Sequence, residues 1–299
     1  MDTDHSLVCA QAEGRDWVLY NGDCIEALRG LPDSSIDYCI YSPPFSSLYT
    51  YSNSDRDLGN SVNYAQFSEH YGFVARELFR VIKPGRLVSF HCMLLPLSKV
   101  RDGIIGLRDF RGDLIRVHEK DGFVLHSEVT IWKDPVTAMQ RTKAIGLLYK
   151  QLRKDSAMSR QGIPDYLVTM RKPGINPRPI DHKPEDFPLD LWQKYASPVW
   201  MDINQSDTLQ RESAREERDE RHIAPLQLEV IRRGLMLWSR QGDTVLSPFA
   251  GIGSEGYEAI RAERKFIGIE LKGSYYIQAV ENLRAAEQLR TGTLFDASA

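Results

Sequence analysis

Residues 244–270 of this 299-residue chain, TVLSPFAGIGSEGYEAIRAERKFIGIE, contain its most regular succession of predicted elements. Residues 244–246 predict a strand, residues 255–262 a helix and residues 265–270 a second strand, and residues 247–254 form a glycine-rich turn before the helix. Such a turn needs glycine because the backbone must approach a ligand without Cβ atoms, while the helix N-terminus faces that ligand. The unit therefore predicts an adenosine-binding site in an α/β sheet.

The glycine spacing also matches a dinucleotide fingerprint. Gly251, Gly253 and Gly256 are spaced as Gly-x-Gly-x-x-Gly, and Glu270 lies nineteen positions beyond the first of them. An acid about 20 residues after such a turn commonly binds ribose hydroxyls, so a nicotinamide cofactor is one interpretation. Only 29 residues follow Glu270, however, so the remaining strands must come from earlier in the chain. Nicotinamide enzymes usually carry the unit at the start of the fold.

A second motif, Ser42-Pro43-Pro44-Phe45, follows the apolar run of residues 36–41, which predicts a buried strand. The two prolines end the strand because neither donates a ladder hydrogen bond and each fixes its own φ. Taken alone, the motif is more often an ordinary proline turn. Placed in one sheet with the glycine turn, it offers hydrogen-bond acceptors and the flat face of Phe45. That combination suits a planar group that carries an NH2.

The composition is that of an ordinary soluble globular protein, with 42% hydrophobic and 26% charged residues, and the length suits one α/β domain with an insertion. No window approaches the ~18 apolar residues of a membrane span, and no signal peptide is visible, so a cytoplasmic location is expected. The four cysteines lack paired C-x-x-C spacing, which argues against a disulfide framework and a zinc site.

The net charge of −3 conceals a basic segment, residues 133–178, in which ten basic residues face three acidic ones. A local charge of +7 in an acidic chain is typical of a segment that contacts phosphates. The alternative is a solvated helix face. The predicted DNA-binding residues in this segment are Arg141, Lys143, Lys150, Arg153, Lys154, Arg160, Arg171 and Lys172.

The other elements follow from apolar spacing and from turn residues. Strands are predicted at residues 17–20 and 86–91, a strand pair at 123–132, and helices at 24–31, 64–81, 226–240 and 275–289, with mixed helical sequence from 92 to 120. Asp23 stands where the N-cap of its helix belongs. Irregular segments are predicted at residues 46–60 (a lid beside the site), 174–198 (a proline-rich extended loop) and 211–221 (an exposed helix or arm).

With both motifs in view, the chain resembles the S-adenosylmethionine-dependent DNA amino-methyltransferases. More narrowly it resembles their β group, in which the catalytic motif precedes the cofactor motif. The resemblance implies an α/β Rossmann-like methyltransferase sheet with helices on both faces, permuted motif order and an inserted target-recognition region. It divides the chain into a catalytic half, residues 17–95, an insertion with connecting loops, 96–215, and a cofactor-binding half, 216–290.

The resemblance also implies roles for individual residues. The catalytic tetrapeptide would be Ser42, Pro43, Pro44 and Phe45. The residues that bind S-adenosylmethionine would be Asp23, His222, Pro225, Pro248, Phe249, Gly251, Gly253, Ser254 and Glu270. Three positions depart from the family pattern: Ser247 replaces the usual Asp, Ala224 the usual Lys, and Ser42 the Asp or Asn of most adenine-specific relatives.

The implied reaction is methylation of the exocyclic nitrogen of a base flipped from double-stranded DNA, and the family often forms homodimers. Adenine N6 is the favoured target because it is the commoner one with this motif order; cytosine N4 is the alternative, and the leading serine favours it. Two other classes stay open: a nicotinamide-dependent oxidoreductase, which leaves Ser42 and its prolines unexplained, and a non-catalytic DNA-binding protein.

Overall fold

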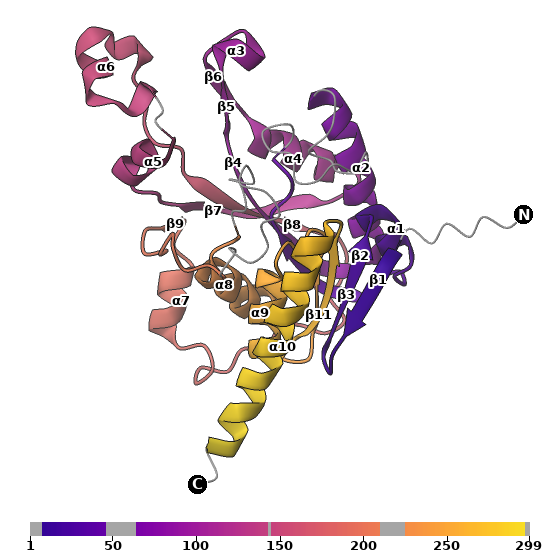
Figure 1. Ribbon diagram of the computed structural model, residues 1–299. Coiled ribbons are helices and arrows are strands. Elements are labelled where there is room, and N and C mark those ends of the chain that lie inside the picture. The colour runs from indigo at the N-terminus through magenta and orange to yellow at the C-terminus, as the bar shows by residue number, and fades with distance from the viewer. Residues whose placement is uncertain (1–7, 46–63, 143–144, 210–224, 297–299) are drawn as a thin grey trace, which may run out of the picture.

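The computed structural model describes residues 8–45, 64–142, 145–209 and 225–296 (Figure 1). Its centre is a nine-stranded sheet with the order β1-β2-β11-β10-β3-β4-β8-β7-β9. The strands of this sheet are β1 Val8–Glu13, β2 Trp17–Gly22, β3 Ile36–Tyr41, β4 Ile82–Met93, β7 Val124–Ile131, β8 Asp165–Arg171, β9 Val199–Trp200, β10 Thr244–Ser247 and β11 Lys265–Glu270.

Helices cover both faces of the sheet, as predicted. One face packs on α1 Cys24–Arg29, α2 Tyr64–Val81 and α4 Phe110–Lys120; the other packs on α8 Leu228–Trp238, α9 Ser254–Arg261 and α10 Gly273–Asp296. Strand β3 is buried along its whole length. Its side chains alternate between the two faces, with Tyr38 and Ile40 in the α8 core and Cys39 and Tyr41 in the α2 core. Among the described helices, none is both long enough and apolar enough to cross a membrane.

The five central strands, β2, β11, β10, β3 and β4, are parallel to one another. Two of them, β10 and β11, come from the C-terminal part of the chain and lie between β2 and β3. The permuted motif order is therefore confirmed. The glycine turn and the Ser42 motif leave the same carboxyl edge from adjacent strands.

The far half of the sheet differs from the prediction. Residues 123–132 do not form a strand pair; they form the single strand β7, which pairs with β8 in antiparallel orientation. Strand β8 also pairs with β4. The partner of β7 lies beyond the basic segment's helices, so no local pattern indicates it. The proline-rich loop predicted at residues 174–198 likewise contains a short helix, α7 Leu189–Tyr195.

Between β7 and β8 the chain leaves the sheet as a projecting arm (Figure 1). The arm consists of α5 Pro135–Thr142, η3 Ile145–Leu147, α6 Tyr149–Lys154 and η4 Ser156–Met158. A second projection nearby is the two-stranded sheet of β5 Leu95–Leu97 and β6 Gly106–Arg108, with α3 Lys99–Asp102 at its end. The predicted irregular segments 46–60 and 211–221 lie outside the described residues.

Candidate active site

The glycine turn contacts the end of β3, the strand that leads directly into the Ser42 motif. Strand β10 pairs with β3 through Val245 opposite Tyr38 and Leu246 opposite Cys39, so the two chains leave the sheet side by side. The rings of Tyr41 and Phe249 lie 5.7 Å apart, centroid to centroid. Two motifs that are far apart in the sequence therefore form one site at the carboxyl edge, where open α/β sheets bind their ligands.

The glycine turn has a backbone conformation that leaves free space beside it. Gly251 has φ +54° and Gly253 has φ +85°, in the left-handed region that favours glycine. Gly253 is the N-cap residue of α9. A Cβ placed on Gly251 would meet no described atom within 4 Å, so this position borders open space. The turn thus presents bare backbone and a helix N-terminus to that space.

Strand β11 anchors the turn. The Gly251 N–H donates to Glu270 Oε2 over 2.8 Å, and the Ala250 N–H donates to the Ile269 carbonyl over 2.8 Å. On the other side, the Asn21 side-chain amide donates to the Glu270 carbonyl over 2.8 Å. Asn21 is a supporting residue that the sequence patterns did not single out. These bonds fix the predicted ribose-binding acid beside the open space.

The third glycine of the fingerprint has a different role. A Cβ on Gly256 would lie 2.5 Å from side-chain atoms of both Leu283 and Phe266. Gly256 therefore allows α9 to pack closely on α10 and β11 and does not face a ligand, as in other dinucleotide-type turns.

The residues at this edge fit an adenosine ligand. The hydroxyls of Ser247 and Ser254 are buried and have no hydrogen-bond partner among the described residues. Buried polar atoms in folded proteins usually have one, so a bound polar molecule would satisfy them. Together with the open space at Gly251 and the carboxylate of Glu270, they form a polar cradle. Ser247 is the position where the family pattern has Asp, so a hydroxyl replaces the carboxylate there.

Glu255, in the first turn of α9, is an acid that sequence patterns did not assign. Its side chain is 4% exposed. Burial, and to a smaller extent the nearby charge of Glu270, raises the pKa of Glu255 to about 8. The carboxyl group is therefore largely protonated at neutral pH. It adds no full negative charge beside Glu270.

Asp23 lies at the end of β2 and caps α1, as predicted. Its Oδ1 accepts from the Ile25 N–H over 2.9 Å and from the Glu26 N–H over 3.2 Å. The cap accounts for its position, and its role near an adenine ring stays a prediction. Pro248 is buried in the glycine turn, and Pro225 is half-buried just before α8. His222 lies outside the described residues.

Ser42 is half-buried and begins a series of four polar residues. Its Oγ is 3.1 Å from His91 Nδ1, and His91 Nε2 is 3.1 Å from Asp165 Oδ2. Lys133 Nζ contacts the other carboxylate oxygen, Oδ1. Burial opposes ionisation of Asp165, but His91 and Lys133 outweigh it and lower the pKa of this carboxyl group below its ordinary value of 3.8.

The rest of the Ser42 motif is anchored in the core. Pro43 is buried and Pro44 half-buried. The Phe45 ring is 9% exposed and packs on Phe110, with 6.1 Å between ring centroids. This contact fixes the end of the motif. Stacking of Phe45 on a substrate base stays a prediction.

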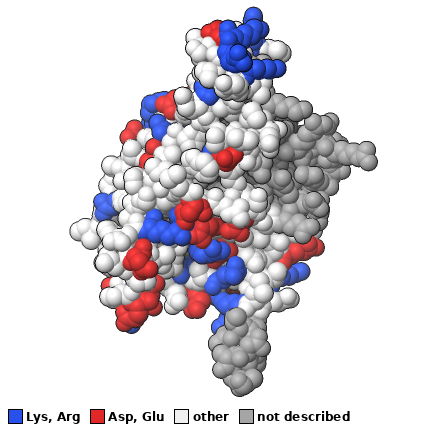
Figure 2. All heavy atoms as spheres, turned by 90° about the vertical axis from the view of Figure 1, so that its left-hand side faces the viewer, with Lys and Arg blue, Asp and Glu red and all other residues white. Residues whose placement is uncertain are grey.

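The predicted DNA-binding residues fall into two groups. Lys150, Arg153 and Lys154 are exposed on α6 at the tip of the arm, which Figure 2 shows as a mainly basic knob at the top of the molecule. Arg171 is also exposed, at the end of β8.

Lys172 is instead bound within the fold, because its ammonium group donates to the carbonyls of Phe79, at 2.6 Å, and of Ile82, at 2.7 Å. Arg160 is half-buried and donates to the Gln161 carbonyl. The Arg141 side chain and Lys143 lie outside the described part.

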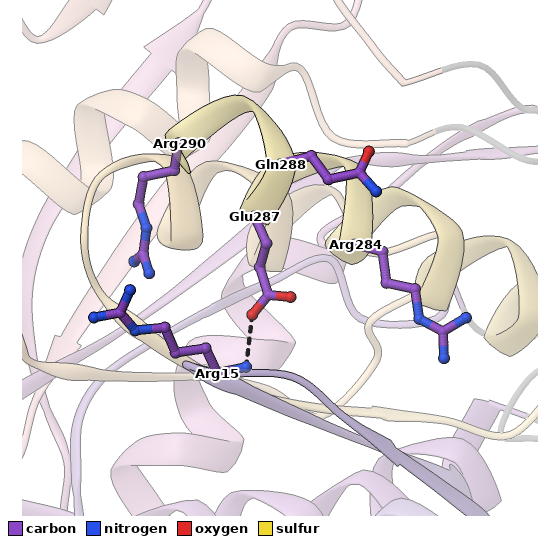
Figure 3. A pocket seen from close by; sticks show the side chains of 5 residues that line it. All are labelled: Arg15, Arg284, Glu287, Gln288 and Arg290. Atoms are coloured by element: carbon purple, nitrogen blue, oxygen red, sulfur yellow. Dashed lines mark hydrogen bonds between the residues drawn. The ribbon is translucent and has the colours of Figure 1, made fainter. Parts of the chain in front are cut away.

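A cavity of about 310 Å³ lies away from these motifs, between α10 and the turn that precedes β2 (Figure 3). It is lined by Arg15, Arg284, Glu287, Gln288 and Arg290. The Arg15 backbone N–H donates to Glu287 Oε1 over 2.7 Å. Because the turn joins the amino end of β2, this cavity is at the opposite edge of the sheet from Ser42 and takes no part in the site.

Comparison with known proteins gives three kinds of match. A family model described as DNA methylase matches residues 36–281. The DNA adenine methyltransferase YhdJ of Escherichia coli K12 is 24% identical over 284 residues, which cover 90% of this chain and 83% of YhdJ.

Two solved structures share the fold. The putative DNA modification methylase TTHA0409 of Thermus thermophilus, complexed with S-adenosyl-L-methionine, has a TM-score of 0.66, 24% identity and coverage of 90% of this chain and 95% of the other. The cytosine-N4-specific PvuII DNA methyltransferase has a TM-score of 0.66, 15% identity and coverage of 95% of each chain.

Proposed function

The chain belongs to the N6/N4 DNA methylase family of S-adenosylmethionine-dependent amino-methyltransferases, and we propose that it methylates the exocyclic amine of a base flipped out of duplex DNA. The observation that carries the proposal is that β3 and β10 are paired and that Tyr41, which directly precedes the Ser42 motif, contacts Phe249 of the glycine turn. An acceptor for an amine and a cradle for an adenosine ligand then lie on adjacent strands. The family match also replaces the nicotinamide interpretation of the glycine turn.

The residues proposed to hold S-adenosylmethionine are those of the polar cradle. Glu270 would accept from the ribose hydroxyls, the backbone at Gly251 would lie against the ligand, and Ser247 and Ser254 would use their unpaired hydroxyls. When bound, the cofactor supplies a methyl group that its sulfonium makes electrophilic. The protein therefore has to position the amine in line with that methyl group, and positioning provides much of the rate.

The Ser42 motif is proposed to activate the amine. An aromatic amine is a poor nucleophile because its lone pair is delocalised into the ring. Hydrogen bonds from its two N–H groups to Ser42 Oγ and to the Pro43 carbonyl would localise that pair toward the methyl group. Phe45 would contact the extruded base, since enzymes that flip bases hold them against aromatic or apolar side chains.

For the target base we favour cytosine N4. Adenine N6 is favoured by motif order, and the relative YhdJ is a DNA adenine methyltransferase. The site, however, begins with Ser42, and in this family a leading serine favours cytosine. The PvuII enzyme, whose fold covers 95% of this chain, is itself cytosine-N4-specific, which agrees with that choice. The amine and its neighbouring ring acceptor are alike in both bases, so the same contacts would serve adenine as the second candidate.

The arm is proposed to contact DNA. It projects from the same sheet as the site and carries the exposed cations Lys150, Arg153 and Lys154. Cations of this kind bind phosphates and fix the position of a protein on the duplex, whereas base readout needs other side chains. Residues 96–215 remain our proposed target-recognition region, with Lys172 left out of the interface.

The experiment that tests the proposal is nucleoside mass spectrometry of mixed-sequence DNA after incubation with the protein and S-adenosylmethionine. We expect N4-methyldeoxycytidine in the DNA digest; N6-methyldeoxyadenosine would change the base and keep the reaction. A reaction without cofactor and one with the Ser42→Ala variant are the controls. DNA binding without any methylated nucleoside would indicate a non-catalytic DNA-binding protein.

A further inference from the structure

The starting observation is a line of polar side chains that is buried at its centre and ends at Ser42. Ser42 follows β3, His91 lies in β4, Asp165 begins β8 and Lys133 follows β7, so four neighbouring strands each contribute one group at the same edge. The strand register produces this alignment, because Tyr41 pairs with Phe90 and Met93 pairs with Asp165. None of the three residues beyond Ser42 belongs to a motif that defines the site.

The distances and burial single out this line as a polar relay. Ser42 Oγ lies at hydrogen-bond distance, 3.1 Å, from His91 Nδ1. His91 Nε2 lies 3.1 Å from Asp165 Oδ2, which is an ion-pair distance without hydrogen-bond alignment. His91 is 8% exposed and Asp165 is 2% exposed. Burying charged groups costs stability, and β4 and β8 are already paired from Leu87 to Met93 along their backbones. Joining the strands therefore does not require this pair.

The relay determines whether the hydrogen or the oxygen lone pairs of the Ser42 hydroxyl face the substrate. Asp165 forms an ion pair with Lys133 and lies against Nε2 of His91, so in the neutral ring it favours the proton on that nitrogen, which leaves Nδ1 as the acceptor. The Ser42 hydroxyl then donates its hydrogen to Nδ1, so its lone pairs point outward. In a Ser-His-Asp hydrolase the two ring nitrogens are used the other way round, with Nδ1 facing the carboxylate. Here the serine is prepared as a hydrogen-bond acceptor.

We infer that His91 is the positioning residue that fixes Ser42 as an acceptor for the exocyclic amine and takes up the proton released on methylation, with Asp165 holding its tautomer. The inference rests on the proposed function. The new bond joins the exocyclic nitrogen to the methyl carbon, and the breaking carbon–sulfur bond leaves its electron pair on sulfur. The nitrogen then carries one proton too many. That proton passes to Ser42 Oγ as the serine hydrogen passes to His91 Nδ1, and Asp165 balances the imidazolium charge.

The test compares single-turnover methylation by the full-length protein and by variants at position 91, with S-adenosylmethionine affinity measured by calorimetry. His91→Ala removes both functions, so the methylation rate should fall about 100-fold or more, while cofactor affinity changes less than about threefold. His91→Asn places an amide oxygen where Nδ1 stood and can still accept from Ser42. We expect it to be about tenfold faster than the alanine variant, because it restores positioning without proton uptake.

A double-mutant cycle separates the relay from general support of the fold. If His91 acts through Ser42, then Ser42→Ala/His91→Ala should be no more than about threefold slower than Ser42→Ala alone. His126→Asn, the same substitution at an exposed histidine of β7 away from the site, is the matched control and should keep the wild-type rate.

Several outcomes would overturn the inference. A His91→Ala rate within about threefold of the wild type would show that His91 is not needed. Asparagine no better than alanine, or losses that add in the double mutant, would make His91 a structural residue. These results differ from a failure of the proposed function itself, in which the wild-type protein would give no methylated nucleoside.

Discussion

Gly251 and Glu270 are joined by a 2.8 Å hydrogen bond from the backbone N–H to Oε2. The bond links the turn after β10 to the last residue of the neighbouring strand, β11. It therefore fixes the acid proposed to bind ribose relative to the bare backbone proposed to lie against the cofactor. The geometry of the cradle depends on both residues.

Gly251→Ala should weaken S-adenosylmethionine binding about tenfold or more. The new Cβ would project into the open space of the cradle, and a left-handed φ costs a non-glycine residue about 1–2 kcal/mol. Calorimetry measures the affinity. Gly242→Ala is the matched control, because Gly242 also has positive φ and open space but lies at the opposite edge. It should lower the melting temperature similarly and leave affinity unchanged; equal losses of affinity would remove Gly251 from the binding site.

Gly256→Ala should destabilise the fold. Its Cβ would lie 2.5 Å from Leu283 and Phe266, and overpacking of this kind typically costs about 1–3 kcal/mol. A thermal unfolding scan should show a melting temperature several degrees lower. A Cβ on Gly72, in α2, would meet nothing within 4 Å, so Gly72→Ala should instead stabilise by about 0.5–1 kcal/mol. An unchanged melting temperature for Gly256→Ala would mean that α9 can move away from α10.

Ser42→Ala should lower the single-turnover rate about 100-fold while cofactor affinity stays near the wild-type value. The variant removes the acceptor for the amine, which is a contact to the substrate and not to the cofactor. Ser35→Ala, near the opposite end of the same strand, removes a hydroxyl that bonds to the Pro32 carbonyl and should leave the rate unchanged. A normal rate for Ser42→Ala would contradict the assigned role.

Charge reversal on the arm, Arg153→Glu/Lys154→Glu, should weaken DNA binding and flatten its salt dependence. Each lost phosphate contact reduces the slope of log affinity against log salt by about 1. Fluorescence anisotropy over a salt series measures that slope. Lys265→Glu/Arg284→Glu changes the same charge at two exposed positions outside the arm and should have a smaller effect. Equal slopes for wild type and arm variant would exclude α6 from the interface.

The pKa of Glu255 predicts a pH-dependent stability. The folded-state pKa, about 8, is above the ordinary value of 4.5, so the folded protein holds a proton that the unfolded chain releases. This contribution is fully present below pH 4.5 and is lost as the pH rises to about 8. Glu255→Gln should therefore raise the melting temperature at about pH 8 more than at about pH 5. Glu69→Gln, at an exposed position of α2, should show no such difference.

Local physics made several parts of the protein predictable from its residues. Prolines that cannot continue a strand and glycines that allow positive φ located the Ser42 motif and the turn at Gly251. Apolar periodicity placed β3, α2, α8 and α9 within a few residues of their bounds. The resemblance to a family with permuted motif order also predicted that the Ser42 strand and the glycine turn share one sheet, as the strand order shows.

Tertiary structure alone decided which distant residues meet. Residues 123–132 gave no local sign of pairing with β8, and His91, Asp165 and Lys133 lie in separate segments without a shared motif. They come together because each strand settles into the register that buries its apolar side chains, and that register is a property of the whole sheet. The same holds for Lys172, whose charge predicted a DNA contact although its ammonium group binds carbonyls at the end of α2 and the start of β4. Local patterns predict what a segment forms; packing across the sheet decides what its side chains touch.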